Sequence, residues 1–69
     1  MSESAWINQM FRAQSVHQGG VIRRSKSSVF KFASQELLVR EVIRRGFHLV
    51  EVGEQFVVLC NPGDLRLVI

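Results

Sequence analysis

The chain has 69 residues, 46% of them hydrophobic and 22% charged, which is typical of one small folded domain and excludes a disordered segment. Nine Lys and Arg residues against six Asp and Glu give a net charge of +3, a mild excess that permits a nucleic-acid partner without requiring one. The longest apolar run, residues 56–60, is too short to cross a membrane, and the single cysteine excludes an internal disulfide.

The start of the chain predicts a cytoplasmic protein, because residues 1–5 lack the positive charges and apolar stretch of a secretory signal. An amphipathic helix is expected from residue 4 to about residue 16, with Ser4 as its N-cap. Its apolar residues fall on one helical face: Trp6, Ile7, Met10 and Phe11. Gly19-Gly20 is expected to end this element.

A short strand is predicted over residues 21–24, because β-branched residues follow the two glycines. A polar loop is expected over residues 25–28. Residues 29–32 fit two structures, since Phe30 and Phe32 alternate as in a strand while Val29, Phe32 and Ala33 would share a helix face.

The clearest helix spans about residues 35–45, with Ser34 as its N-cap and Gly46 as the residue that ends it. Four residues form its expected apolar stripe: Leu38, Val39, Val42 and Ile43. Two ion pairs with favourable four-residue spacing are expected on its polar face: Glu36–Arg40 and Glu41–Arg45.

A β-hairpin is predicted from residues 47–52 and 55–60 around a two-residue type II′ turn at Gly53-Glu54. That turn fixes a register in which Val50 lies opposite Val57. Residues 61–64 predict a type II turn and residues 65–69 a third strand. The expected fold is therefore a single α+β domain, residues 1–69, with a small, mostly antiparallel sheet (the C-terminal hairpin plus this third strand) and two helices.

The same register separates the residues that could form a nucleophilic site. Cys60 shares a face with Phe47 and Leu49, whereas His48 points to the opposite face because side chains alternate along a strand. A nucleophilic cysteine needs a nearby base, so Cys60 is interpreted as a small buried apolar residue. Possible metal ligands are scattered without a paired motif: His17, His48, Cys60 and Asp64. No pair of carboxylates stands out, and we expect no enzyme, no metal site and no cofactor.

One basic stretch is concentrated enough to suggest nucleic-acid contacts. It contains Arg23, Arg24 and Lys26, followed by serines whose hydroxyls could also contact phosphate oxygens. The alternative is a solvated edge strand whose charges prevent aggregation. Both interpretations stay open from the sequence.

The second face of the hairpin is unusually apolar for a solvated sheet face. It holds His48, Val50, Val52, Val57 and Leu59. Either the N-terminal helix covers it, giving a three-layer monomer, or a second copy or another protein does. The leading functional expectation is a non-enzymatic protein-association module that forms a homodimer or binds a protein partner. The alternative is a small nucleic-acid-binding regulatory protein that uses the basic stretch; no membrane partner is expected.

Residues 35–59 resemble the HicA-type mRNA interferases, toxins with a double-stranded-RNA-binding-like fold, in their helix, Gly-Phe junction and hairpin. Those toxins carry a catalytic His on the second hairpin strand, where this chain reads Gln55-Phe56-Val57-Val58-Leu59, so their activity does not transfer. Along its whole length the chain is similar to short alphaproteobacterial reading frames, notably in Trp6-Ile7, residues 19–25 and residues 45–49. That resemblance implies a stand-alone cytoplasmic protein and assigns no site residues.

Overall fold

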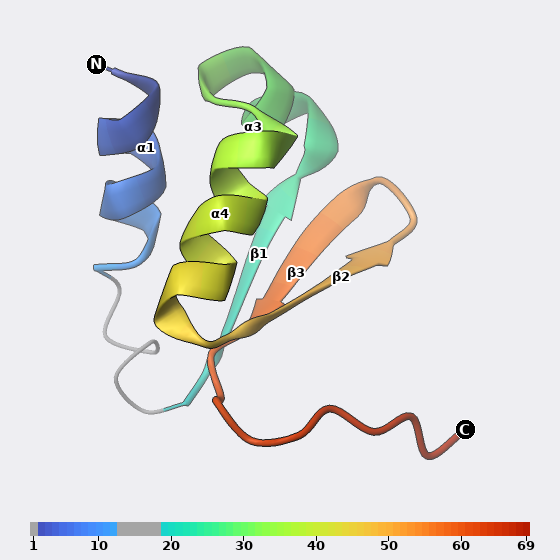
Figure 1. Cartoon of the computed structure of the whole chain (residues 1–69). Helices are drawn as coiled ribbons and strands as arrows, with labels where there is room; N and C mark the ends of the chain where they lie inside the picture. The colour runs from blue at the N-terminus through green and yellow to red at the C-terminus, as the bar shows by residue number, and fades with distance from the viewer. Residues whose placement is uncertain (1, 13–18) are drawn as a thin grey trace.

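The computed structural model describes residues 2–12 and 19–69, which form an α+β fold of helices packed on one side of a small sheet (Figure 1). The described helices are α1 (Glu3–Met10), α3 (Lys26–Phe32) and α4 (Gln35–Arg45). The strands are β1 (Val21–Ser25), β2 (His48–Val52) and β3 (Gln55–Leu59). They form an antiparallel sheet in the order β1-β3-β2, so β3 is the central strand.

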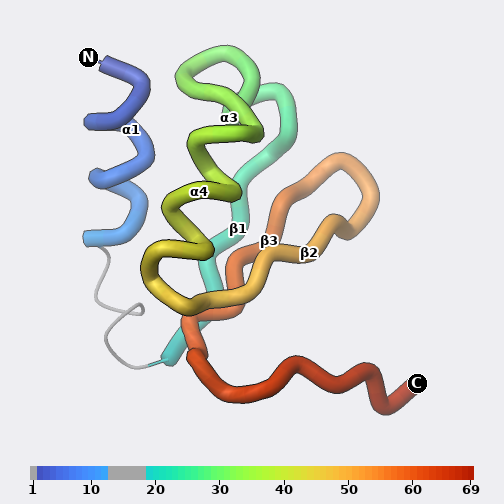
Figure 2. The backbone as a smooth tube through the Cα atoms, viewed as in Figure 1, coloured from blue at the N-terminus to red at the C-terminus, as the bar shows by residue number. Residues whose placement is uncertain are grey.

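The third strand of the sheet is β1, and the prediction that residues 65–69 fill this place is wrong. β1 pairs along β3, with Arg23 opposite Val57, and it buries Ile22 in the core. Residues 65–69 form no strand. They follow a bend in which the Gly63 N–H donates to Asn61 Oδ1 at 2.7 Å, and the chain then runs away from the sheet (Figure 2).

The segment between β1 and α4 is helical, which decides the structure of residues 29–32. The predicted polar loop over residues 25–28 is wrong, because Ser25 ends β1 and also caps α3. Its hydroxyl oxygen accepts a hydrogen bond from the Ser28 N–H at 3.2 Å, which satisfies a free donor of the first helical turn. Val29 is fully buried, and Phe30 packs edge-on against Phe56 with ring centroids 6.0 Å apart.

Helix α1 differs from its prediction at its start. Its N-cap is Ser2 and not Ser4, because the Ser2 hydroxyl accepts from the Ala5 N–H at 3.1 Å. The helix ends at Met10, residues 11–12 form a turn, and the rest of the predicted helix lies outside the described residues.

The predicted ends of α4 and the predicted hairpin register are confirmed. The Ser34 hydroxyl accepts from the Leu37 N–H at 3.2 Å, and Gly46 ends the helix with a left-handed φ of 74°. In the hairpin, Val50 lies opposite Val57, and Gly53 takes a φ of 57° in the turn, a value that favours glycine.

The core lies between the helices and one face of the sheet. It is made by residues from every described helix and from β1 and β3: Ile7, Met10, Phe11, Ile22, Val29, Ala33, Leu38, Val42, Phe56, Val58 and Cys60. The predicted stripe of α4 is only half correct, because Leu38 and Val42 are buried but Ile43 is 70% exposed. Leu37 packs against the core in its place, since α4 is turned toward α1.

The alternative of a three-layer monomer, in which the N-terminal helix covers the second face of the hairpin, is excluded. Helix α1 buries Ile7 and Met10 in the same core as α4 and therefore lies on the same side of the sheet (Figure 1). None of the described helices covers the other sheet face. Within residues 2–12 and 19–69, no helix is long and apolar enough to cross a membrane.

Candidate functional site

The basic stretch does not gather into one surface. Ile22 points into the core, so Arg24 shares its side of the sheet while Arg23 lies on the uncovered side. The Arg24 guanidinium donates to the Arg23 carbonyl oxygen at 2.6 Å. Lys26 starts α3, and its ammonium lies 3.1 Å from a carboxylate oxygen of Glu51. Arg24 and Lys26 therefore lie on the helix side of the sheet and Arg23 on the other, and the charge of Lys26 is already paired.

A second polar surface, which was not predicted from the sequence, lies on the outward face of α4. Gln35, Glu36 and Arg40 are exposed in the first half of this helix, and Val39 and Ile43 lie between and beyond them. The expected ion pair between Glu36 and Arg40 does not form. We call the five residues Gln35, Glu36, Val39, Arg40 and Ile43 the α4 face. In the sequence, this surface is indicated by different polar side chains that cluster at the start of a capped helix. The four-residue spacing of Glu36 and Arg40 had been interpreted as an ion pair instead.

The opposite flank of α4 holds a structural ion-pair cluster. The Glu41 carboxylate accepts from Arg44 Nε at 3.0 Å and from Arg45 Nε at 2.7 Å, which confirms the predicted pair with Arg45. The hydrogen bond from Arg44 is the main reason that the pKa of Glu41 falls to about 2, and Arg45 lowers that pKa further, whereas burial acts the other way. The Arg45 guanidinium also stacks 4.5 Å above the Phe11 ring.

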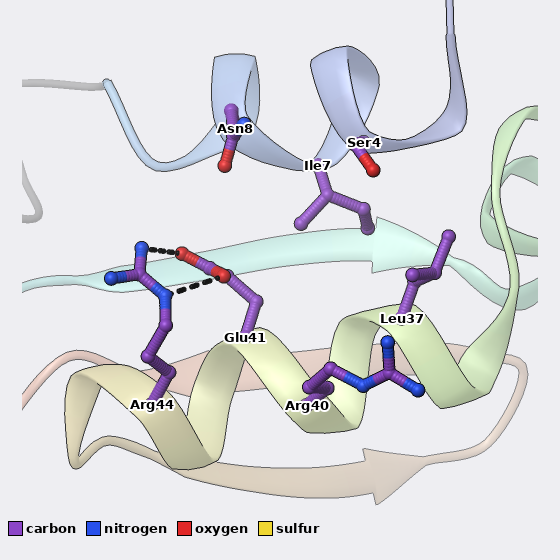
Figure 3. Close-up of a pocket in the computed structure, with 7 residues that line it drawn as sticks. All are labelled: Ser4, Ile7, Asn8, Leu37, Arg40, Glu41 and Arg44. Carbon is purple, nitrogen blue, oxygen red and sulfur yellow. Dashed lines mark hydrogen bonds and ion pairs between the residues drawn. The ribbon is translucent and has the colours of Figure 1, made fainter.

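A groove of about 300 Å³ runs between α1 and this flank (Figure 3). Ile7 and Leu37 project into it from the two helices, while Arg44 and Glu41 close one end with their ion pair. The two helices are held together by apolar packing beneath the groove, where Ile7 is buried in the core and Leu37 packs against it.

The predicted association face is brought together on the uncovered side of the sheet. His48, Val50 and Val52 come from β2, and Val57 and Leu59 from β3. β1 adds Val21 and Arg23, which were not predicted to join this face because residues 65–69 were expected beside the hairpin. We call these seven residues the open face.

Exposure varies across the open face. Val57 is only 5% exposed because it lies between Arg23 and Val50 on the neighbouring strands, whereas Val52 is 58% exposed. His48 Nε2 donates to the carbonyl oxygen of Gly63 at 2.5 Å, which holds the bend after β3 next to the start of β2.

Cys60 lies on the helix side of the sheet, away from the open face. It is buried in the core, and burial raises the pKa of its thiol, although the charge of Arg45 acts in the opposite direction. No three His, Cys, Asp or Glu residues in the described part of the chain are grouped as metal ligands would be.

Comparison with protein-family models, curated proteins and solved structures gave no match. Function is therefore inferred from geometry and side-chain chemistry.

Proposed function

We propose that this protein binds duplex DNA through α4. The observation that carries the proposal is the exposed α4 face on the second of two consecutive helices. α3 and α4 are separated only by Ala33 and Ser34, and the β2–β3 hairpin follows directly. This element order, with strands in the order β1-β3-β2, is that of a winged helix-turn-helix. In helix-turn-helix proteins the second helix enters the major groove with its N-terminal residues on the base edges.

The side chains of the α4 face suit the major groove. Gln35 is a side chain of the type that pairs with adenine, and Arg40 of the type that pairs with guanine. Glu36 can accept a hydrogen bond from the cytosine amino group. Val39 and Ile43 offer apolar surface of the kind that contacts thymine methyl groups, which gives the 70% exposure of Ile43 a use. Because one fold can host unrelated functions, these side chains support the proposal more than the topology does.

Substitutions of two arginines distinguish DNA binding through the α4 face from DNA binding through the basic stretch. Arg40 lies on the α4 face and Arg23 on the open face, so replacing each by Ala removes one exposed positive charge from opposite sides of the molecule. Binding to labelled duplexes of random and selected sequence is measured by fluorescence anisotropy at several salt concentrations. A bidentate contact to a base contributes about 1–3 kcal/mol, so Arg40→Ala is expected to weaken binding to its preferred sequence about 5- to 150-fold.

Arg23→Ala is expected to change that affinity less than about twofold at moderate salt, because its charge lies far from the bound DNA. If Arg23→Ala weakens binding and Arg40→Ala does not, the basic stretch is the binding site and the α4 proposal is wrong. Absence of binding at low salt would reject nucleic-acid binding altogether.

A second candidate function, self-association, is favoured by the uncovered open face. Its apolar residues on three strands are covered by no described helix, although such faces normally carry polar side chains toward water. A second copy of the chain is the occupant that we propose. The protein would then act as a homodimer, which suits a helix-turn-helix protein because dimers bind two half-sites.

A further inference from the structure

Residues 65–69 have the composition of a strand but no partner within the described chain. They run away from the body of the protein after the bend at residues 61–63 (Figures 1 and 2). Leu67 is 85% and Val68 93% exposed, so their apolar side chains face water. An exposed apolar segment with high strand propensity tends to pair with an available sheet edge.

The sheet offers two such edges, because β1 and β2 each pair only with β3. β1 is a poor partner for this segment, since Arg66 would lie close to Arg23 or Arg24 on its two sides. β2 carries Glu51, whose exposed carboxylate pairs with Lys26 at 3.1 Å and has acceptor sites left for a second cation, and its other side chains are apolar apart from His48. Charge therefore favours pairing with β2.

If residues 65–69 pair antiparallel with the five residues of β2, charged side chains meet opposite charges on one face and apolar side chains meet on both faces. This register pairs Leu65 with Val52, Arg66 with Glu51, Leu67 with Val50, Val68 with Leu49 and Ile69 with His48. Arg66 then meets the carboxylate of Glu51, and Val68 meets the partly buried Leu49. The parallel alignment of the same residues would place Arg66 beside Leu49 and Val68 beside Glu51, which loses both matches.

The chain cannot make this pairing with its own residues 65–69. The hydrogen bond from His48 to Gly63 holds residue 63 near the start of β2. Leu65 would have to lie beside Val52, which is four residues or about 13 Å further along the strand. Two residues of extended chain span at most about 7 Å. The segment that fits the edge must therefore come from another molecule.

We propose that residues 65–69 of one copy pair antiparallel with β2 of a second copy, and that the exchange is reciprocal. The dimer has two-fold symmetry, so each copy donates one strand and receives one. Leu65, Leu67 and Ile69 extend the open face beside Val52, Val50 and His48. This inference rests on the self-association proposed above and names the segment that produces it.

The contact is small. Each copy contributes the five residues of β2 and the five of residues 65–69, whereas a standard stable interface uses roughly 20–30 residues a side. The dimer is therefore expected to dissociate on dilution, with a monomer–dimer equilibrium visible in the micromolar range.

Analytical ultracentrifugation of the full chain across this range tests the proposal. Leu67→Asp is expected to weaken the dimer about tenfold or more, because the change falls in both exchanged strands. Ile43→Asp is the matched control, since it also places a carboxylate at an exposed apolar position but on α4, and it should shift the equilibrium less than about twofold. Circular dichroism checks that both variants are folded.

A charge exchange adds a test that does not depend on removing apolar surface. Arg66→Glu alone should weaken the dimer, and so should Glu51→Arg alone, which also removes the ion pair of Glu51 with Lys26. The two substitutions together should restore the dimer. If Leu67→Asp and the charge variants leave the monomer–dimer equilibrium unchanged, the strand exchange is wrong, but self-association through the open face still stands. A wild-type protein that stays monomeric throughout this range would overturn both.

Discussion

Neighbouring valines on β3 allow a sharp test of the two-layer fold, because they are almost equally inaccessible but face opposite sides of the sheet. Val58 is 0% exposed and belongs to the core, whereas Val57 is 5% exposed and lies on the open face. Replacing each by Thr keeps shape and strand propensity but adds a hydroxyl. In Val58→Thr the hydroxyl is buried among apolar side chains without a partner, at a cost of about 1–3 kcal/mol.

Val57 is buried only by the neighbouring side chains of the open face, so in Val57→Thr the hydroxyl lies nearer to water and we expect a clearly smaller cost. The expected difference between the two costs is large for this protein, because a domain of 69 residues has a free energy of unfolding of only roughly 3–10 kcal/mol. Urea unfolding followed by the fluorescence of Trp6, which packs on the core and stacks with Phe32, provides the measurement.

Protein concentration is the control in this experiment. Measurements at the lowest practical concentration report on the monomer, and there the two substitutions should differ clearly. Equal costs at that concentration would refute a sheet covered on one side only. A cost of Val57→Thr that grows with concentration would instead indicate that a second copy covers the open face.

Two further predictions concern titratable side chains. The pKa of Glu41 is about 2 in the folded protein against an ordinary 4.5, so its ion pairs stabilise the fold fully above pH 4.5, and this contribution is lost as the pH falls toward 2. Glu41→Gln should therefore lower the unfolding free energy by on the order of 1–2 kcal/mol at neutral pH, allowing for solvent around Arg44, and by almost nothing near pH 2; a constant difference across this range would contradict the assignment. Cys60 is buried and its thiol pKa is raised, so a thiol reagent should modify it in native protein only as fast as the fold opens. Modification at the rate of the urea-unfolded chain would show that this part of the core is open.

The features that the sequence predicted correctly depend on local signals. Ser34 and Gly46 mark the ends of α4 because capping needs only the residues next to a helix end. Gly53 fixes the hairpin register because a two-residue turn leaves one pairing. The separation of Cys60 from the open face followed from the same alternation of side chains.

The predictions that were wrong concern features that depend on contacts between distant parts of the chain. The strand predicted over residues 21–24 is confirmed as β1, whereas the one predicted over residues 65–69 is wrong, because burial of Ile22 in the core decided which segment joined the sheet. Ile43 fits an apolar stripe as well as Leu37 does, and the packing of α1 against α4 decided which of them faces the core. The α4 face was missed for the same reason, because helical periodicity cannot show which flank other elements leave exposed.

The position of bound DNA on the protein tests the central claim most directly. Backbone amide chemical shifts of isotope-labelled protein, titrated with a duplex at low and moderate salt, report which residues contact it. Binding through α4 predicts that the largest changes occur at Gln35, Glu36, Val39 and Arg40, with small changes at Arg23 and Val57. Large changes confined to the open face, or no changes at any salt concentration, would contradict the account.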